Sequence, residues 1–378
     1  MKSNTKDIWI YIGIFAGAAF ISIVYGYLMH TFGTFGGDSK YYVGQAQRIL
    51  SDGLGFYMDH ISTPYYWGYP TFLALCIAVV GENWMAVAFV QVFLSALSMI
   101  FLYHIVYEII DNFALSILLT LFYKLILDTS MWDGRILSDS LGMTLECMTL
   151  YFFYMAMQNR KKKDYIWFSV FALLFFTTRT NSISLIIILV IAALVKIPGK
   201  AKWIVCGAAA VIILAGLIVA GGNGYYGVGT QMGKFVNYFR QGEIVHGRPE
   251  YDYLIPEGHI GTPLFILDIL LMVLLKAKYY WSIYFNGYST VHIALCIVTI
   301  LPIFLLTLFS AVCIIRDKQK QLYPFVVGIV SYSFFQICTE VDFDQRYRAP
   351  IFLLCIICSA YGTKKIYLWM RQRIQRKG

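Results

Sequence analysis

Asp38 is the carboxylate whose place in the chain best suits it to catalysis. It follows a long apolar segment (residues 8–29) and a short glycine-rich turn, and it begins an amphipathic stretch that ends near Gly53. An apolar segment of this length crosses a bilayer as one helix, so we expect Asp38 at the outer end of that helix. There it could accept a proton from a substrate that arrives through the lipid. The alternative is structural, because Gly-Asp-Ser is also an ordinary helix start with the aspartate as N-cap.

A second carboxylate, Asp139, lies about one turn inside another apolar segment, four residues after Arg135. An unpaired charge within a bilayer is costly, so Asp139 needs a partner or a polar cavity. It either pairs with Arg135 on the same helix or faces the cavity that Asp38 faces. In the second case it would orient a substrate or alter the pKa of Asp38, because two nearby carboxylates push their pKa values apart. Glu146, deeper in the segment, is expected to make a polar contact between helices.

Arg346 and Arg348 flank Tyr347 just before a helix that Pro350 introduces. Guanidinium groups bind phosphate through two parallel hydrogen bonds, so this turn is a candidate phosphate site. The alternative is a surface network in which the arginines pair with the acidic residues of the same turn. Those acids are Glu340, Asp342 and Asp344.

Three further cations are candidates for the same anionic ligand. Lys276 and Lys278 end an apolar segment of a long loop and could instead be snorkelling anchors at the headgroup level. Arg179 lies in a short polar turn between two apolar segments, where a lone cation favours an anionic partner.

The composition identifies a membrane protein. Of the 378 residues 59% are apolar, 17% are aromatic and 13% are charged, and the mean hydropathy is +0.66. A soluble domain does not need this much apolar surface. The net charge of +9 comes from short basic connections beside apolar segments, which argues against a nucleic-acid partner. The eight cysteines lie in or beside apolar segments without metal-ligand spacing and are expected to be reduced packing residues.

We predict an all-α polytopic fold with about ten transmembrane helices. Basic loops stay in the cytoplasm, and the connections 160–163, 196–202 and 316–320 lie on the same side as the basic N-terminus (Lys2 and Lys6) only if residues 65–81 do not cross the membrane. We therefore expect 65–81 to be a helix on the outer face and both termini to be cytoplasmic. The predicted spans are 8–29, 84–107, 113–127, 136–157, 165–179, 181–196, 203–221, 290–315, 322–338 and 349–369.

Several motifs occur in an order that resembles the polyprenyl-phosphate-sugar-dependent membrane glycosyltransferases of the GT-C fold. This group includes the protein mannosyltransferases and the aminoarabinose transferase of lipid A (glycosyltransferase family 39-like). The resemblance covers roughly residues 1–220 and returns at 340–351. Its motifs are Asp38-Ser39 with Tyr42, Gly68-Tyr69-Pro70, Ser138-Asp139-Ser140, Arg179, and Arg346-Tyr347-Arg348-Ala349-Pro350.

The resemblance implies site roles for these residues. Asp38 would be the catalytic base, and Asp139 would match the second acid. Tyrosines and cations of the outer face would line the lipid-phosphate site: Tyr42, Tyr69, Arg179, Lys276, Lys278, Arg346, Tyr347 and Arg348. Several family members have two adjacent acids in the first outer loop. Here Ser39 follows Asp38, so we expect no metal ion and no other cofactor.

The sequence thus predicts an inverting glycosyltransferase of the bacterial cytoplasmic membrane, with its site on the outer face. It would move a hexose or pentose from a polyprenyl-phosphate carrier to a lipid, protein or cell-wall acceptor. We expect a catalytic membrane module at 1–221 that includes the outer loop 30–83, an outer loop with an amphipathic helix at 222–289, and C-terminal transmembrane helices at 290–378. Two alternatives stay open: a flippase for a lipid-linked sugar, and a polysaccharide polymerase or ligase that uses Arg240, His246 and Arg248.

Overall fold

The computed structural model describes residues 5–60, 66–179, 181–196, 239 and 241–376, and the regular secondary structure in these ranges is entirely helical. The predicted span 203–221 and Arg240 lie outside the described residues. The helices are α1 (Thr5–Leu28), α2 (Ser39–Asp52), α3 (Leu54–Asp59), α4 (Gly68–Val80), α5 (Trp84–Ile110), α6 (Phe113–Leu125), α7 (Leu127–Ser130), α8 (Ser138–Asn159), α9 (Lys162–Thr178), α10 (Ser182–Lys196), the short 3₁₀ helix Pro249–Tyr251, α13 (Leu264–Tyr280), α14 (Thr290–Arg316), α15 (Tyr323–Cys338) and α16 (Ile351–Gln375).

Side-chain caps set the starts of several long helices. The side-chain oxygens of Asn83, Asn112 and Ser289 accept hydrogen bonds from the third backbone N–H of α5, α6 and α14, at 3.1, 3.1 and 3.2 Å. Each bond satisfies a donor that the helix itself leaves unpaired. The local sequence therefore defines where these helices begin.

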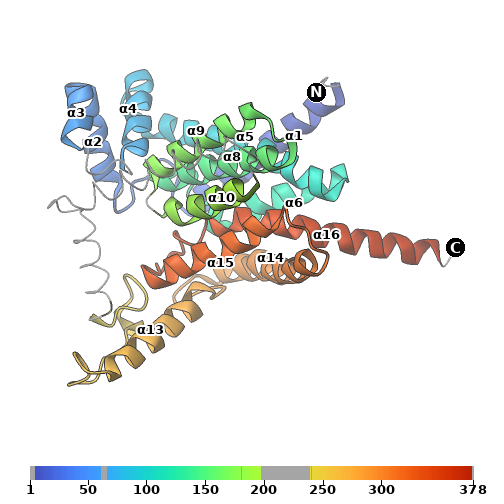
Figure 1. Cartoon of the computed structure of the whole chain (residues 1–378). Helices are drawn as coiled ribbons and strands as arrows, with labels where there is room; N and C mark the ends of the chain where they lie inside the picture. Colours follow the sequence, from blue (N-terminus) through green and yellow to red (C-terminus); the bar gives the residue numbers. More distant parts are fainter. Residues whose placement is uncertain (1–4, 61–65, 180, 197–238, 240, 377–378) are drawn as a thin grey trace.

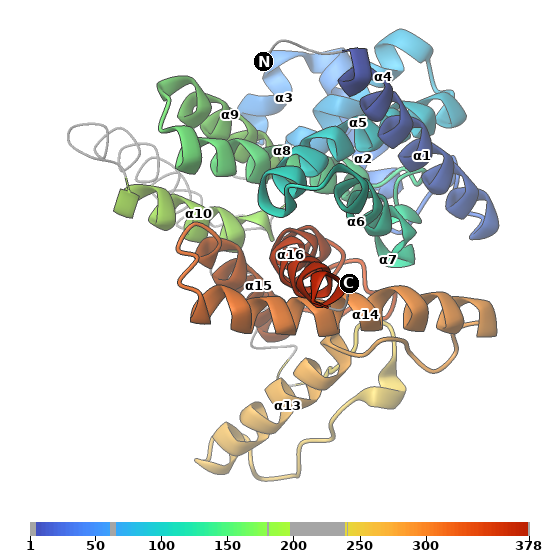
Figure 2. The ribbon, with the colours of Figure 1, turned by 90° about the vertical axis from the view of Figure 1, so that its right-hand side faces the viewer.

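The long helices form one bundle with α16 near its middle (Figures 1 and 2). The first half of α16 is buried, from Ile351 through Gly362. By contrast, α1, α5 and α14 keep large apolar side chains on the outside, such as Phe20 at 68% and Leu308 at 67% exposed. Such a surface suits a lipid solvent better than water.

Among the described residues, four helices are long and apolar enough to cross a membrane: α1, α5, α14 and α16. The shorter apolar helices α6, α10 and α15 occupy the predicted spans 113–127, 181–196 and 322–338, and α8 and α9 occupy 136–157 and 165–179. The chain is therefore a multi-pass membrane protein, but the count of about ten spans is not confirmed.

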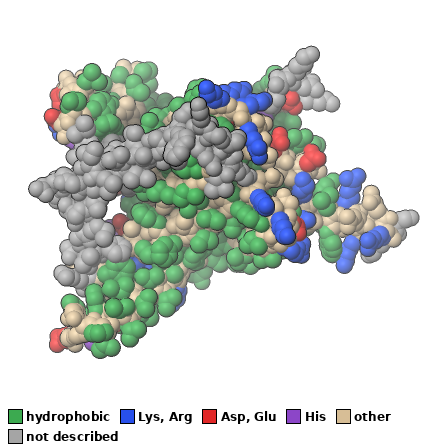
Figure 3. Space-filling model, viewed as in Figure 1, with side chains coloured by type: hydrophobic (Ala, Val, Ile, Leu, Met, Phe, Trp, Pro, Cys, Tyr) green, Lys and Arg blue, Asp and Glu red, His purple; other side chains and the backbone are tan. Residues whose placement is uncertain are grey.

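The two ends of the bundle differ in chemistry. Both termini lie at one end, which we call the basic end, whereas α2, α3, α4 and α13 lie at the other, the site end (Figure 1). Lys and Arg gather toward the basic end, and apolar side chains dominate the flank of the bundle (Figure 3). The exposed residues 160–163 and the connection 316–320 supply much of this charge.

Helix α4 does not run along the bundle. It lies beside α2 at the site end and runs across the direction of the long helices (Figure 1). This geometry agrees with the expectation that residues 65–81 do not span, although the orientation of the chain in the membrane stays a prediction.

Candidate active site

A cavity of about 380 Å³ opens at the site end of the bundle. Segments far apart in the sequence form its wall: the start of α2, the residue two positions before α4, the start of α8, the α9–α10 connection and the turn before α16. Six predicted site residues line it: Asp38, Tyr42, Asp139, Arg179, Arg346 and Tyr347. The structure thus gathers both predicted catalytic carboxylates, two guanidiniums and two tyrosines around one space.

Backbone hydrogen bonds between two loops bring the start of α2 to the start of α8. The N–H of Gly33 donates to the carbonyl of Gly134 at 2.8 Å, and the N–H of Ile136 donates to the carbonyl of Thr34 at 3.0 Å. The Ser39 hydroxyl then donates to the carbonyl of Ile136 at 2.6 Å. These bonds hold Asp38, which precedes α2, near Asp139 in the first turn of α8.

A buried ion pair anchors the loop before α8. Asp133 is fully buried, and its Oδ2 accepts hydrogen bonds from Lys124 Nζ and the Ser22 hydroxyl, both at 2.6 Å. Its Oδ1 accepts from the hydroxyls of Ser95 at 2.8 Å and Ser140 at 3.2 Å. A buried carboxylate is tolerated when its charge is paired and its lone pairs are satisfied. The network therefore fixes the loop before α8 against α1, α5 and α6.

Asp139 pairs with Arg179. Their closest atoms, Oδ1 and Nη1, are 2.7 Å apart, and both side chains are at most 5% exposed. The alternative pairing with Arg135 does not form: the Arg135 guanidinium lies over the Trp132 ring, 5.5 Å from its centroid. Gly142 makes the observed pairing possible, because a Cβ at that position would collide with Cδ of Arg179.

Asp38 occupies the N-cap position of α2, yet its side chain makes no capping bond. Its Oδ2 lies 3.3 Å from Nη1 of Arg346, and its side chain remains 53% exposed. The carboxylate is therefore held at the rim of the cavity by one cation and is accessible to a substrate. Asp139, by contrast, is buried and paired with Arg179.

Arg346 is surrounded by acceptors. Its Nη2 donates to the Tyr347 hydroxyl at 2.9 Å, and its Nε lies 3.8 Å from Oδ2 of Asp342. Burial alone would lower the pKa of the Arg346 guanidinium, but the charges of Asp139, Tyr347, Asp344 and Asp342 outweigh it and raise that pKa. In the same turn, burial and the Asp342 carboxylate raise the pKa of Asp344 to about 7. The guanidinium is thus a permanent positive charge facing the cavity.

Four predicted site residues do not line the cavity. Tyr69 is 1% exposed, donates to Gln91 Oε1 at 2.7 Å and supports the ring of Tyr42 at a centroid distance of 5.0 Å. Arg348 is buried in an ion pair with Asp128 at 2.6 Å. Lys276 donates to the carbonyl of Thr339 at 3.0 Å, and Lys278 is exposed on α13 with its ammonium 5.2 Å from the centroid of the Tyr279 ring.

Residues that the sequence analysis did not assign also line the cavity. Asn181 is 6% exposed, and neither atom of its amide has a hydrogen-bond partner among the described residues. A buried amide without partners costs free energy unless a ligand satisfies it. The sequence signal that could have identified Asn181 is its position two residues after Arg179, in the same polar turn between two apolar segments. The others are Tyr41, Tyr66, Ser138 and Thr178.

One group of described residues has the composition of a metal site. Ligand atoms of Asp128, His292 and Cys296 lie within 4.8 Å of one another. These residues do not line the cavity, and the guanidinium of Arg348 already neutralises the Asp128 carboxylate.

Comparison with known proteins gives one family. The model of the dolichyl-phosphate-mannose-protein mannosyltransferase family matches residues 67–223, a range that contains Asp139 and Arg179 but not Asp38 or Arg346. No curated protein and no solved structure matches the chain. Together, the match and the all-helical membrane fold indicate a membrane glycosyltransferase of the GT-C type, similar over residues 67–223 to the dolichyl-phosphate-mannose-protein mannosyltransferase family.

Proposed function

We propose that this protein transfers a sugar, with inversion, from a polyprenyl-phosphate carrier to an acceptor hydroxyl on the outer face of a bacterial cytoplasmic membrane. The observation that carries the proposal is the cavity itself, which combines one accessible carboxylate with two buried or half-buried guanidiniums. This combination suits a reaction that removes a proton from one partner and releases a phosphate from the other.

Asp38 is the proposed general base. Its carboxylate is exposed at the rim, so an acceptor hydroxyl can reach it without disturbing the fold. The base takes the hydroxyl proton while the oxygen attacks the anomeric carbon, and the bond from that carbon to the phosphate oxygen breaks. Positioned general-base catalysis is worth about 10²- to 10⁴-fold in rate.

Arg346 is the proposed ligand of the leaving phosphate. Arg179, which lines the same cavity, supplies a second positive charge. Fixed donors that face the developing negative charge stabilise the transition state without having to reorganise. A donor phosphate would compete with Asp38 for Arg346, so donor binding would free the base at the moment it is needed. Because guanidiniums already supply positive charge here, we expect the transfer not to require a divalent metal.

Asp139 is the proposed positioning residue. Its ion pair with Arg179 at 2.7 Å fixes the guanidinium across α8. The unpartnered amide of Asn181 and the hydroxyls of Tyr42 and Ser138, which lie 3.3 Å apart, are suited to hold sugar hydroxyls. The matched family uses lipid-linked sugars, which supports a donor of this kind.

The test is sugar release by the purified full chain in lipid nanodiscs. Polyprenyl-phospho-[¹⁴C]mannose and the corresponding glucose lipid are the donors, with a membrane extract of the source cells as acceptor. Asp38→Asn should keep the fold and lower the transfer rate at least about 100-fold. The matched control is Asp59→Asn, which removes another exposed aspartate from α3 at the same end. Wild-type turnover by Asp38→Asn would overturn the assignment of the base. In sealed proteoliposomes, label that crosses the membrane while still lipid-linked would favour a flippase.

A further inference from the structure

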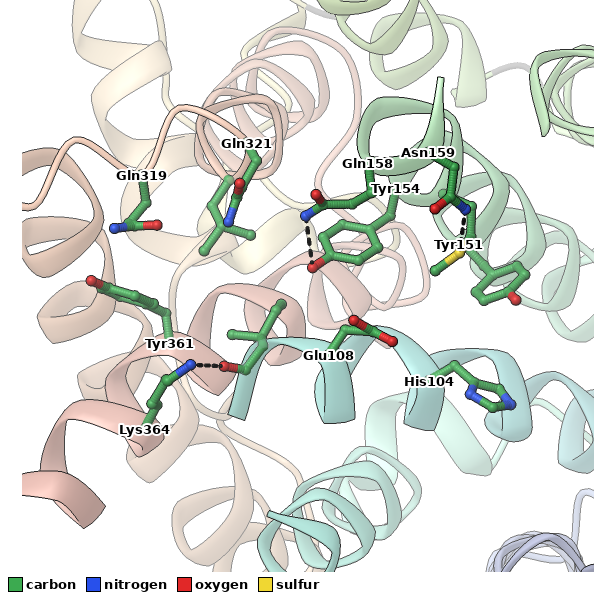
Figure 4. Close-up of a pocket in the computed structure, with 13 residues that line it drawn as sticks. His104, Glu108, Tyr151, Tyr154, Gln158, Asn159, Gln319, Gln321, Tyr361 and Lys364 are labelled. Atoms are coloured by element: carbon green, nitrogen blue, oxygen red, sulfur yellow. Dashed lines mark hydrogen bonds between the residues drawn. The ribbon is translucent and has the colours of Figure 1, made fainter. Parts of the chain in front are cut away.

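A second cavity, of about 500 Å³, lies at the basic end of the bundle. Its wall comes from the last turns of α5 and α8, the connection between α14 and α15, and the middle of α16 (Figure 4). It shares no lining residue with the site cavity. We call it the basic-end cavity, and its volume falls in the range of small-molecule sites.

The lining is rich in hydrogen-bonding groups, and most of them are neutral. Figure 4 shows the amides of Gln158 and Gln321, the hydroxyl of Tyr154 and the carboxylate of Glu108 around the same space. The Gln158 amide nitrogen donates to the Tyr154 hydroxyl at 3.1 Å, and its carbonyl oxygen, to which no described residue donates, can accept from a ligand. The remaining polar lining groups are Tyr151, Asn159, Gln319 and Tyr361, with His104 at one side.

This set of side chains suits a ligand with several hydroxyl groups. Amides offer a donor and an acceptor side by side, which matches two adjacent hydroxyls, and a phenol can do both. Aromatic faces such as that of Tyr151, which lies 6.2 Å from His104 between ring centroids, pack against the C–H groups of a polyol.

The charge around the mouth favours an anion. The exposed connection 160–163 carries one arginine and three lysines, and Lys318 and Lys320 are exposed beside Gln319. The acid in that connection is already occupied: Asp317 accepts from Lys365 at 2.7 Å and from the Tyr361 hydroxyl at 2.9 Å, and these bonds lower its pKa to about 2. A cleft with this surplus attracts negative ligands.

Lys364 links two helices of the lining, α16 and α5. Its ammonium donates to the carbonyl of Ile109 at 2.9 Å, one of the carbonyls that the end of α5 leaves without a helical partner. This bond fixes the cation within the lining and leaves two of its three N–H groups for a ligand oxygen.

We propose that the basic-end cavity binds a phosphorylated polyol. The amides and tyrosines hold its hydroxyls, and Lys364 with the surrounding basic connections holds its phosphate. The same chemistry comes from two sources: the glycerol headgroup of an anionic phospholipid, and a soluble glycerol or sugar phosphate. This inference goes beyond the proposed transfer reaction and depends on none of the site residues.

The experiment measures binding to the purified full chain and not activity, so it can fail independently of the glycosyltransferase proposal. One arm titrates sn-glycerol 1-phosphate, with glycerol and inorganic phosphate as partial ligands, and follows the melting temperature in detergent. The other arm measures retention of phosphatidylglycerol by native mass spectrometry, with phosphatidylcholine of the same chains as the control lipid.

Gln158→Leu keeps the size of the side chain and removes both hydrogen-bonding groups. We expect at least a tenfold weaker affinity for the ligand that the wild-type chain binds, and a similar loss for Lys364→Met. The matched controls are Gln47→Leu and Lys40→Met on α2 at the site end, which should bind as wild type. Lys364→Met also removes the bond to Ile109, so Gln158→Leu keeps the test decisive if that variant does not fold.

Each outcome has one meaning. Soluble ligand binding that is lost in Gln158→Leu supports the proposal with a soluble source, and selective phosphatidylglycerol retention that is lost in Gln158→Leu supports it with a lipid source. Binding of neither ligand, equal retention of both lipids without binding of the soluble ligand, or unchanged binding by Gln158→Leu overturns it.

Discussion

The Oδ2 of Asp38 lies 3.3 Å from Nη1 of Arg346, although 308 residues separate them in the chain. This contact joins the first and last lining segments of the site cavity. It also pairs the proposed base with the proposed phosphate ligand. The two roles therefore depend on one ion pair, which an incoming phosphate would have to exchange.

Arg346→Lys should weaken the use of the donor and leave the fold intact. Lysine keeps the charge but loses the planar fork that binds two phosphate oxygens at once. We expect a KM for the lipid-linked sugar about tenfold higher, with a melting temperature close to wild type, because the Arg346 pair with Asp38 is partly exposed and such pairs contribute only about 0–1 kcal/mol.

Arg348→Lys is the contrasting variant. Arg348 is buried and donates to Asp128 and to the carbonyls of Tyr280 and Ser282, a set that a single ammonium cannot satisfy. We expect a loss of about 1–3 kcal/mol of stability, with an unchanged KM in the protein that remains folded. Transfer rate against donor concentration and melting curves separate the two. An unchanged KM in Arg346→Lys would argue against its role in phosphate binding.

Gly142→Ala should disrupt the site through one methyl group. The added Cβ would overlap Cδ of Arg179, so the guanidinium must leave its position beside Asp139. We expect a lower melting temperature and at least a tenfold lower transfer rate. Gly44→Ala is the control, because a Cβ there meets nothing within 4 Å and alanine in a helix is favoured over glycine by about 0.5–1 kcal/mol. Equal behaviour of the two variants would contradict the packing of Arg179 across α8.

The turn before α16 should make stability depend on pH. Burial and Asp342 raise the pKa of Asp344 from an ordinary 3.8 to about 7, so the folded chain holds a proton there that the unfolded chain releases. The stability that this proton contributes is present in acid and is lost as the pH rises from about 4 to about 7. Glu340, Asp342, His246 and Arg346 surround the same turn.

Asp344→Asn cannot ionise and should therefore flatten this dependence. Melting curves from pH 5 to pH 8 should fall more steeply for the wild type than for Asp344→Asn. Asp52→Asn on α2 should keep the wild-type slope. Parallel slopes for the wild type and Asp344→Asn would show that the carboxyl is ionised throughout.

Labelling from outside the cell tests the proposed orientation. Single cysteines at positions 59 and 161 replace exposed residues at opposite ends of the bundle. A membrane-impermeant maleimide should label the first and not the second in intact cells. The wild-type chain sets the background, since six of the seven described cysteines are buried and Cys338 is half-buried. Labelling at 161 without labelling at 59 would place the site cavity on the cytoplasmic side. That result would contradict a reaction on the outer face of the membrane.

The sequence by itself determined the class of fold and the neighbourhood of the site. Apolar segments long enough to span a bilayer, separated by basic connections, require a helical membrane protein because unpaired backbone groups are too costly in lipid. The amphipathic stretch after Asp38 forms α2, and residues 68–80 of the predicted segment form α4, because helical periodicity is a local property of the chain.

The tertiary structure alone decided which charges meet. Arg346 and Arg348 are two residues apart in an irregular turn, and only packing determines that the first faces the cavity and the second is buried against Asp128. Asp139 has a cation four residues before it but pairs with Arg179, 40 residues later. Ion pairs in a low-dielectric interior form between whichever groups the fold brings within a few ångströms. That proximity depends on the long-range packing of helices, which no local pattern records.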